Sequence, residues 1–224
     1  ETNATGTLRL VQALPEGARL LFVSSAEVYG VVPEEEQPIP ETRALRPTNP
    51  YAASKAAAEM AVVEAAARGI HAVTTRSFSH TGPGQDARFA LASFARQLAA
   101  VRAGEAEPVL RVGNLEARRD YLDVRDVIAA YRLLIDGGTP GEVYNVATGV
   151  AHSMRELVEM MIEVSGTGAR LEVDPERVRP TDVPLLLGDP SKLRALGWEP
   201  RIPIRQTLSD LLEAEAASHA APVR

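Results

Sequence analysis

A short apolar run that ends in two serines is the feature that most constrains how this chain folds. The run spans residues 20–23 (LLFV), and Ser24 and Ser25 follow it directly. Such a run is typical of a strand that is buried on both faces of a parallel sheet. An Ala-rich helical segment at residues 51–68 and a β-branched segment at residues 71–76 come next. The order strand, helix, strand predicts a doubly wound α/β sheet.

The patterns beyond Gly82 are mixed and predict a second, smaller part of the molecule. Apolar periodicity predicts helices at residues 89–103, 124–135, 154–164 and 204–214, and short strands at residues 109–112, 143–146 and 171–173. We expect residues 1–82, interleaved with parts of 113–150, to form the C-terminal half of a Rossmann-like domain. Residues 83–224 are expected to form mainly a smaller α/β lobe that binds substrate. The cleft between the two parts is the natural ligand site.

Composition argues against several classes of function. A net charge of -6 in 224 residues leaves no basic surface to neutralise the phosphates of a nucleic acid. Without cysteine the chain has no disulfide and no Cys-ligated metal, and we expect no metal site. No stretch approaches the ~20 apolar residues of a membrane span, and the first residues lack the pattern of a signal peptide. We therefore expect a cytoplasmic protein without a membrane or nucleic-acid partner.

Tyr51 and Lys55 form the first candidate for chemistry. They lie four residues apart at the start of the Ala-rich helix, so their side chains share one face. A Tyr has a reference pKa of about 10 and exchanges protons poorly at neutral pH. A neighbouring ammonium is expected to lower that pKa, which is the change that a general acid or base requires. The pair alone favours a packed Tyr and a solvated Lys, because Tyr-x-x-x-Lys recurs on many helices.

Two blocks together make a catalytic interpretation specific. Ser25 ends the apolar strand and opens the block SAEVYG, and the carboxyl ends of strands are where open α/β sheets bind ligands. A hydroxyl there can donate to a developing oxyanion, although Ser is also a common helix cap. The second block is NPYAASK at residues 49–55. With their spacing, the two blocks resemble those of the extended short-chain dehydrogenase/reductases that act on nucleotide sugars.

Within that family the chain is most similar to the GDP-4-dehydro-6-deoxy-D-mannose reductases, and next to the GDP-mannose 4,6-dehydratases. The resemblance covers essentially the whole chain. It includes NATGT at residues 3–7, RSFSHTGPGQ at 76–85, GNL at 113–115 through RDYLDVRD at 119–126, YNV at 144–146, RPTDVP at 179–184, GDPSKL at 188–193 and LGW at 196–198. It implies an NAD- or NADP-dependent homodimer that reduces the C4 keto group of a GDP-4-dehydro-6-deoxyhexose, giving GDP-D-rhamnose or its C4 epimer.

The resemblance also implies roles for matched residues around the reacting centre. Tyr51 would exchange the proton at the sugar C4 oxygen, and Ser25 would hydrogen-bond the same oxygen. Lys55 would hold the nicotinamide ribose and lower the pKa of Tyr51. The residues that would line the nicotinamide half of the cofactor site are Asn3, Ser24, Phe78 and His80, together with Tyr51 and Lys55.

A further set of matched positions would contact the nucleotide sugar. This set comprises Ser79, Arg96, Arg119 and Arg179. Arg119 and Arg179 match arginines that clamp the diphosphate, and the planar guanidinium suits that role because it binds phosphate oxygens bidentately. Either Arg taken alone would be read as a solvated surface charge. Many relatives carry Asn where this chain has Ser79, which predicts a shorter-reaching or water-mediated hydrogen bond at that position.

Glu27 leaves two interpretations open. In the dehydratases a Glu two positions after the catalytic hydroxyl removes the C5 proton of the sugar before water leaves C6, and Glu27 occupies that position. Reductase-like chains also tolerate an acidic residue here, and in this second interpretation it serves only to hydrogen-bond a loop. The sequence PGQ at residues 83–85 stands where the dehydratases usually carry an Arg-rich stretch, and this favours the reductase.

The sequence departs from the family at its start. The family opens with a strand, a Gly-x-x-Gly-x-x-Gly loop and a helix that cradle the cofactor pyrophosphate, and these residues contain no counterpart. We therefore expect a Rossmann-like sheet without its N-terminal cofactor-phosphate half, and the choice between NAD and NADP depends on that half. Three explanations stay open: part of a longer protein, a reading frame that starts inside the gene, or a non-enzymatic relative that keeps a sugar-nucleotide lobe or a partner-binding surface. The first two are favoured.

Overall fold

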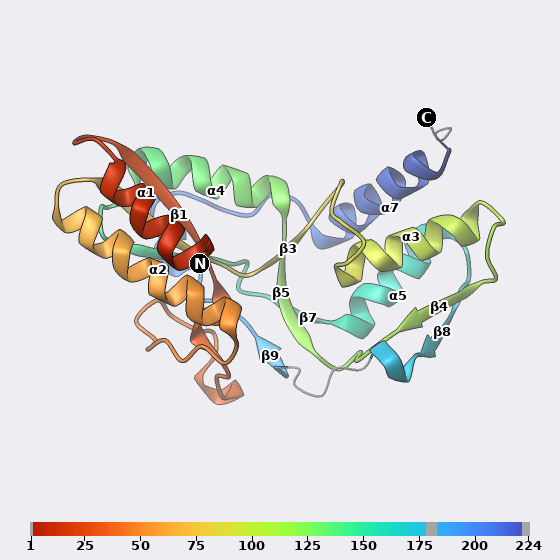
Figure 1. The fold of residues 1–224 in the computed structure, drawn as a ribbon. Helices are drawn as coiled ribbons and strands as arrows, with labels where there is room; N and C mark the ends of the chain where they lie inside the picture. The colour runs from red at the N-terminus through yellow and green to blue at the C-terminus, as the bar shows by residue number, and fades with distance from the viewer. Residues whose placement is uncertain (1, 178–182, 221–224) are drawn as a thin grey trace.

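A computed structural model describes residues 2–177 and 183–220 of the chain. Figure 1 shows two bodies side by side. One contains a short parallel sheet with helices on both faces, and the other is a lobe of three long helices beside a pair of strands. A group of central strands connects them. This arrangement confirms the predicted α/β class.

The sheet of the first body consists of three parallel strands in the order β1-β2-β6. They are β1 (Arg19–Ser25), β2 (His71–Ser77) and β6 (Val143–Val146). Ser25 lies opposite Ser77 at the carboxyl ends of the first two strands. The run of four apolar residues therefore forms a strand of a parallel sheet, as its pattern predicts.

Helices cover both faces of this sheet. The π-helical turn η1 (Thr2–Gly6) leads into α1 (Thr7–Ala13), which packs with α2 (Pro50–Ala67) on one face. Helix α4 (Val124–Gly137) packs on the other. Successive side chains of a strand point to opposite faces. Accordingly, Ala72 belongs to the core with Val62 of α2, whereas Val73 belongs to the core with Leu134 of α4.

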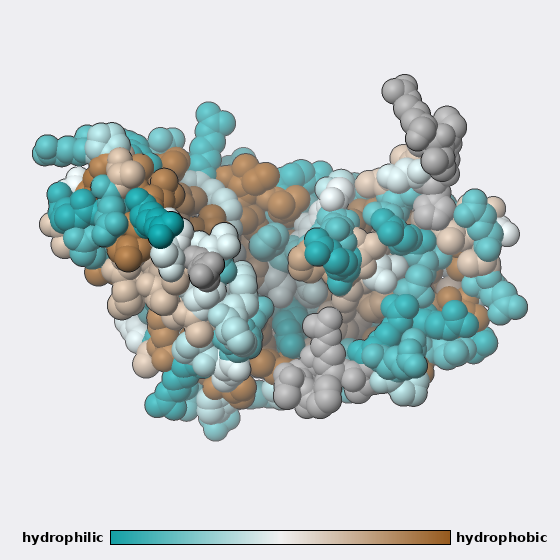
Figure 2. Space-filling model, viewed as in Figure 1, coloured by the Kyte–Doolittle hydropathy of each residue, from teal (hydrophilic) through white to brown (hydrophobic). Residues whose placement is uncertain are grey.

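The lobe has a core of its own. Helices α3 (Ala90–Arg102), α5 (Met154–Ser165) and α7 (Ile204–Ala220) pack together and against the parallel pair β4 (Val109–Val112) and β8 (Arg170–Val173). Leu98, Leu157 and Leu208, one from each helix, are fully buried in this core. On the face seen in Figure 2, the lobe presents mostly hydrophilic side chains, whereas hydrophobic ones show among the helices of the first body.

Four short strands lie between the two bodies. They are β3 (Ser79–Thr81), β5 (Arg118–Asp123), β7 (Ala151–Ser153) and β9 (Leu185–Leu186), and β5 pairs with each of the other three. The remaining elements are single turns: η2 (Ala26–Tyr29), η3 (Glu34–Glu36), η4 (Pro175–Arg177) and α6 (Ser191–Arg194). None of the helices in the described ranges combines the length and apolar character that crossing a bilayer requires.

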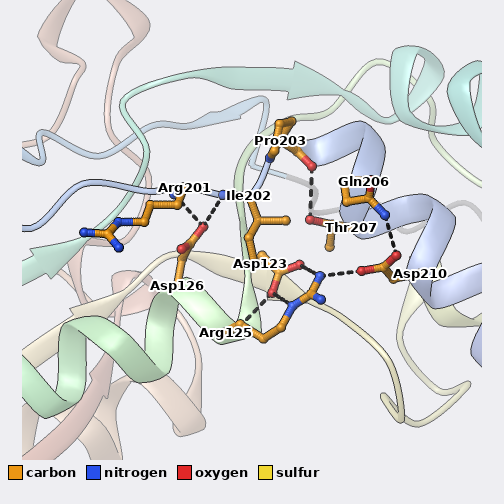
Figure 3. Close-up of polar contacts among 9 residues, drawn as sticks. All are labelled: Asp123, Arg125, Asp126, Arg201, Ile202, Pro203, Gln206, Thr207 and Asp210. Atoms are coloured by element: carbon orange, nitrogen blue, oxygen red, sulfur yellow. Dashed lines mark hydrogen bonds and ion pairs between the residues drawn. The ribbon is translucent and has the colours of Figure 1, made fainter.

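A polar cluster fixes the lobe to the first body where β5 runs into α4 (Figure 3). Asp123 caps α4 and accepts two side-chain hydrogen bonds from Arg125, at 2.8 and 2.7 Å. The same guanidinium donates to Asp210 of α7 at 2.6 Å. Asp126 accepts from two backbone N–H groups just ahead of α7, at 3.0 and 2.9 Å. Helix α7 of the lobe is therefore held by the helix that covers the sheet.

Candidate active site

The carboxyl end of β1 opens into a cleft of about 840 Å³. Ser25 ends β1 and caps the turn η2, because its Oγ accepts a hydrogen bond from the backbone N–H of Glu27 at 3.2 Å. Both side chains line the cleft, and Tyr51 lines it from the start of α2. Strand β1 and helix α2 thus bring together two side chains that the sequence analysis paired for catalysis.

Helix α2 begins at the cleft because of its local sequence. Asn49 is the cap, and its Oδ1 accepts from the backbone N–H of Ala52 at 2.8 Å. Pro50 follows at a position where the missing N–H costs nothing. Tyr51 comes next and is 47% exposed, so its hydroxyl-bearing ring is accessible from the cleft. Lys55 lies one turn further along the same face.

The pKa of Tyr51 is raised, and this corrects the expectation that Lys55 lowers it. Burial of the phenol is the largest cause and the Glu27 carboxylate is the second, while a hydrogen bond with Ser25 opposes them. Lys55 donates to the backbone carbonyl of Val23 at 2.8 Å, and its ammonium lies 5.9 Å from the centre of the Tyr51 ring. The ammonium is thus directed to the strand, and burial lowers its own pKa.

Of the residues expected at the nicotinamide end, Ser24, Tyr51, Phe78 and His80 line the cleft, whereas Asn3 and Lys55 do not. The Ser24 side chain is only 3% exposed, and its hydroxyl has no hydrogen-bond partner among the described residues. Asn3 is tied to the catalytic helix, because its amide donates to the Ser54 hydroxyl at 3.0 Å. A buried hydroxyl without a partner fits a bound group that supplies the missing hydrogen bond.

A second cleft of about 630 Å³ lies beside the first. Four residues line both clefts: Phe89, Ala90, Arg119 and Tyr121. Arg119 lies on β5 and donates to the backbone carbonyl of Arg118 at 2.8 Å. The two clefts therefore adjoin, and Arg119 belongs to the wall that they share.

A buried polar network underlies the first cleft. Arg76 of β2 donates to Glu59 of α2 at 2.7 Å, and the two side chains are 7% and 1% exposed. The same guanidinium donates to the Tyr29 hydroxyl at 3.1 Å, which donates to Asn145 of β6 at 2.7 Å. Because Tyr29 ends η2, the turn that follows Ser25, the network joins the two segments that carry the candidate catalytic side chains.

Comparison with known proteins agrees with this architecture. A sequence profile of the GDP-mannose 4,6-dehydratase family matches residues 1–211. The chain belongs to this family. It is 38% identical over 217 residues to the GDP-6-deoxy-D-mannose reductase of Pseudomonas aeruginosa, covering 95% of this chain and 71% of that protein. The GDP-mannose 4,6-dehydratase of Sinorhizobium fredii is 33% identical over 239 residues, covering 95% and 67%.

A solved structure described as RMD from Pseudomonas aeruginosa complexed with NADPH matches with a TM-score of 0.90 at 37% identity. The match covers 96% of this chain and 73% of that one. The dTDP-glucose 4,6-dehydratase of Bacillus anthracis in complex with NAD matches with a TM-score of 0.83 at 27% identity. Membership of the dehydratase family and the Rossmann-like fold, both expected from the sequence motifs, are thereby confirmed.

The residues expected at the substrate have different places in the structure. Arg96 of α3 pairs with Glu215 of α7 at 3.2 Å and is not among the residues that line either cleft. Arg179 lies outside the described residues. Ser79 does line the first cleft.

The sequence analysis assigned no role to three residues of the site. Asn49 donates from its Nδ2 to the Glu27 carboxylate at 2.8 Å, and Phe89 and Tyr121 form the shared wall of the two clefts. The sequence contained a signal for Asn49, because Asn is favoured as a helix N-cap and Pro at the first position of the helix. Tyr121 belongs to the motif RDYLDVRD but was given no role of its own, and Phe89 had no signal beyond the apolar pattern of its helix.

Proposed function

We propose that this protein reduces the C4 keto group of a GDP-4-dehydro-6-deoxyhexose with NADH or NADPH, giving a GDP-D-rhamnose type of product. The observation that carries the proposal is the meeting of Ser25 and Tyr51 in one cleft that shares Arg119 with a second cleft. The similarity to a GDP-6-deoxy-D-mannose reductase supports this substrate class.

In this mechanism Tyr51 is the proton donor. A phenol with the ordinary Tyr pKa of about 10 is already neutral at pH 7, and the raised pKa of Tyr51 extends this proton-donating form to higher pH. Ser25, hydrogen-bonded to Tyr51, would donate to the same oxygen as negative charge develops on it. The O–H bond of Tyr51 breaks as an O–H bond forms at the sugar, and solvent later returns a proton to the phenolate.

The nicotinamide supplies the hydride when the cofactor is bound. Lys55 and the unpaired hydroxyl of Ser24 are suited to hold its ribose, and Phe78 and His80 to form the wall of its pocket. An ammonium that now donates to a backbone carbonyl can exchange that acceptor for ribose hydroxyls. We assign Asn3 to the same end through its contact with Ser54 of the catalytic helix.

For the substrate, we assign the sugar to the first cleft and the nucleotide to the second. Arg119, on the wall common to both, is positioned to bind the diphosphate between them, and Arg179 remains a candidate for the same role. Ser79 would contact the sugar side. In this assignment residues 1–82, with parts of 113–150, serve cofactor and catalysis, and residues 83–224 serve mainly the nucleotide sugar.

The test is a pair of assays on the protein that also contains the family's glycine-rich cofactor half. With GDP-4-keto-6-deoxymannose and NADPH, the enzyme should oxidise the cofactor stoichiometrically. With GDP-mannose and catalytic NADP, it should form no 4-keto-6-deoxy sugar. Tyr51→Phe should lower kcat about 10²–10⁴-fold, the usual worth of general acid catalysis, with the fold unchanged. Turnover within a factor of about three of the parent would remove Tyr51 from the mechanism.

A second candidate function is 4,6-dehydration, and the place of Glu27 favours it. The carboxylate lines the cleft beside Tyr51, where a base for the sugar C5 proton is needed. If the GDP-mannose assay yields product and the reduction assay does not, the dehydratase is the function, and Glu27→Gln should then abolish turnover. Silence in both assays, with cofactor binding absent, would favour a non-enzymatic role.

We further propose that the protein is a cytoplasmic homodimer without a nucleic-acid partner. Helices α1 and α2 present apolar side chains to solvent, among them Leu8 at 43%, Met60 at 59% and Val63 at 45% exposed. An apolar surface shared by two adjacent helices suits a second copy of the chain. Light scattering of the purified protein tests this: a monomer at micromolar concentration would contradict it.

A further inference from the structure

Asn49 makes two hydrogen bonds with opposite ends of its amide. Its Oδ1 accepts from the backbone N–H of Ala52 at 2.8 Å, which caps helix α2. Its Nδ2 donates to Oε2 of Glu27 at 2.8 Å. The proposed mechanism uses neither contact. One side chain therefore fixes the start of the helix that carries Tyr51 and also holds a carboxylate of the turn that follows Ser25.

The two contacts have different chemical requirements. A helix cap needs only a side-chain oxygen, and Ser serves there about as well as Asn. Holding the Glu27 carboxylate needs the N–H donor, which Ser at this position does not supply to the same acceptor. Glu27 is the exposed residue of a turn whose other residues are buried, so without the donor its side chain is free to turn toward solvent. Helix capping therefore accounts for a side-chain oxygen at position 49 but not for the N–H group of an amide.

The carboxylate that Asn49 holds acts on Tyr51. An anion beside a phenol disfavours the phenolate, and Glu27 is the second cause of the raised pKa of Tyr51 after burial. Other titratable or charged groups around this corner are Lys55 of α2, Tyr131 of α4, His80 of β3 and Arg119 of β5. Of the groups named, Glu27 is the anion, and its charge extends the neutral form of the phenol to higher pH.

We propose that Asn49 is a positioning residue, which holds the Glu27 carboxylate beside Tyr51 and so extends the neutral, proton-donating form of Tyr51 to higher pH. The consequence for turnover rests on the proposed reductase function. The effect on the Tyr51 proton does not, because it concerns groups of this chain alone. Reduction requires the protonated phenol, so its rate falls as pH rises through the Tyr51 pKa. Loss of the Asn49 contact should move that fall to lower pH.

The primary test is a titration of the tyrosines by NMR, with carbon-13 at Cζ. The chain has five tyrosines, and Tyr51→Phe identifies the signal of Tyr51. In Asn49→Ser and in Glu27→Gln we expect the Tyr51 pKa to fall, because the carboxylate that disfavours the phenolate is released in the first variant and removed in the second. In the double variant we expect no further fall beyond that of Glu27→Gln, because Asn49 acts through Glu27. The tyrosine signal separates this effect from the titration of Lys55.

Two outcomes would overturn the proposal. The first is a Tyr51 pKa in Asn49→Ser equal to that of the parent, and the second is an additive shift in the double variant. Asn49→Ala serves as the capping control: it should lower the melting temperature, which Asn49→Ser should leave nearly unchanged. The pH profile of kcat is the second readout. If the parent reduces no keto sugar, the proposed function fails, and the titration still decides the role of Asn49.

Discussion

The catalytic corner and the lobe are held together by different forces. Under the catalytic helix, a buried ion pair between Glu59 and Arg76 continues through Tyr29 to Asn145. The lobe is built on a continuous apolar core, and ion pairs such as Arg102 with Glu213 lie on its surface. Hydrogen bonds are directional and apolar contacts are not. The buried network therefore adds directional contacts between the segments that carry the candidate catalytic side chains, whereas the lobe depends mainly on the apolar packing of its helices.

The largest loss of unfolding free energy is expected when one partner of the buried Arg76–Glu59 ion pair is removed. Arg76→Met leaves the Glu59 carboxylate buried without its partner, and breaking such a pair costs about 3–5 kcal/mol of unfolding free energy. Urea unfolding followed by circular dichroism measures this. Replacing both partners, with Glu59→Leu added, should recover part of the loss because no charge stays unpaired. A loss below about 1 kcal/mol for Arg76→Met would mean that the network does not hold the corner.

In the lobe, the substitution expected to lower the unfolding free energy most is one that leaves a cavity in the apolar core. Leu211 on α7 is fully buried in the lobe core, and Leu211→Ala should cost about 2–5 kcal/mol of unfolding free energy. Leu196→Ala, at a leucine that is 37% exposed, is the control and should cost less. The comparison predicts that Leu211→Ala leaves the pKa of Tyr51 unchanged, whereas Arg76→Met shifts it. A Tyr51 shift in Leu211→Ala would show that the lobe also sets the catalytic geometry.

The same difference explains how much of the fold could be predicted from the sequence. Apolar runs and helical periodicity predicted β1, α2, β2 and the long helices of the lobe, because each buries a continuous set of apolar side chains. Strand β5 was missed. Its sequence is RRDYLD, and its pairing with β3, β7 and β9 depends on residues far along the chain.

For the site, motif spacing brought Ser25 and Tyr51 together but not the groups that tune them. The four-residue spacing placed Lys55 beside Tyr51. It did not predict that the Lys55 ammonium donates a hydrogen bond to the backbone carbonyl of Val23. The predicted sign of the Tyr51 pKa shift was wrong because burial of the phenol and the Glu27 carboxylate raise the pKa. The pattern of α3 did not reveal that Arg96 pairs with Glu215 of α7, and the role of Arg96 at the substrate stays a prediction.

Arg119 lies between the two regions and should affect binding more than stability. Arg119→Ala should weaken the binding of GDP by about 1.5–3 kcal/mol, the worth of hydrogen bonds to a charged group. Part of the loss should disappear at high salt, where Coulomb attraction is screened. Arg96→Ala is the control, since Arg96 pairs with Glu215 outside both clefts. Calorimetry that finds equal GDP affinity in both variants would place Arg119 among the surface charges.

The smallest effect on unfolding free energy is expected for the exposed Arg–Glu pair of the lobe, Arg102 with Glu213. Arg102 of α3 donates to Glu213 of α7 at 2.7 Å, a distance equal to that between Arg76 and Glu59, but its side chain is 42% exposed and that of Glu213 59%. Water solvates both partners when the pair is broken, so a double-mutant cycle with Arg102→Ala and Glu213→Ala should give a coupling of about 0.2–1 kcal/mol. The coupling should shrink further as salt screens the two charges. Burial, and not contact distance, then separates the two pairs. A coupling above about 2 kcal/mol would contradict this, and would mean that surface ion pairs hold α3 to α7 as the buried pair holds the catalytic corner.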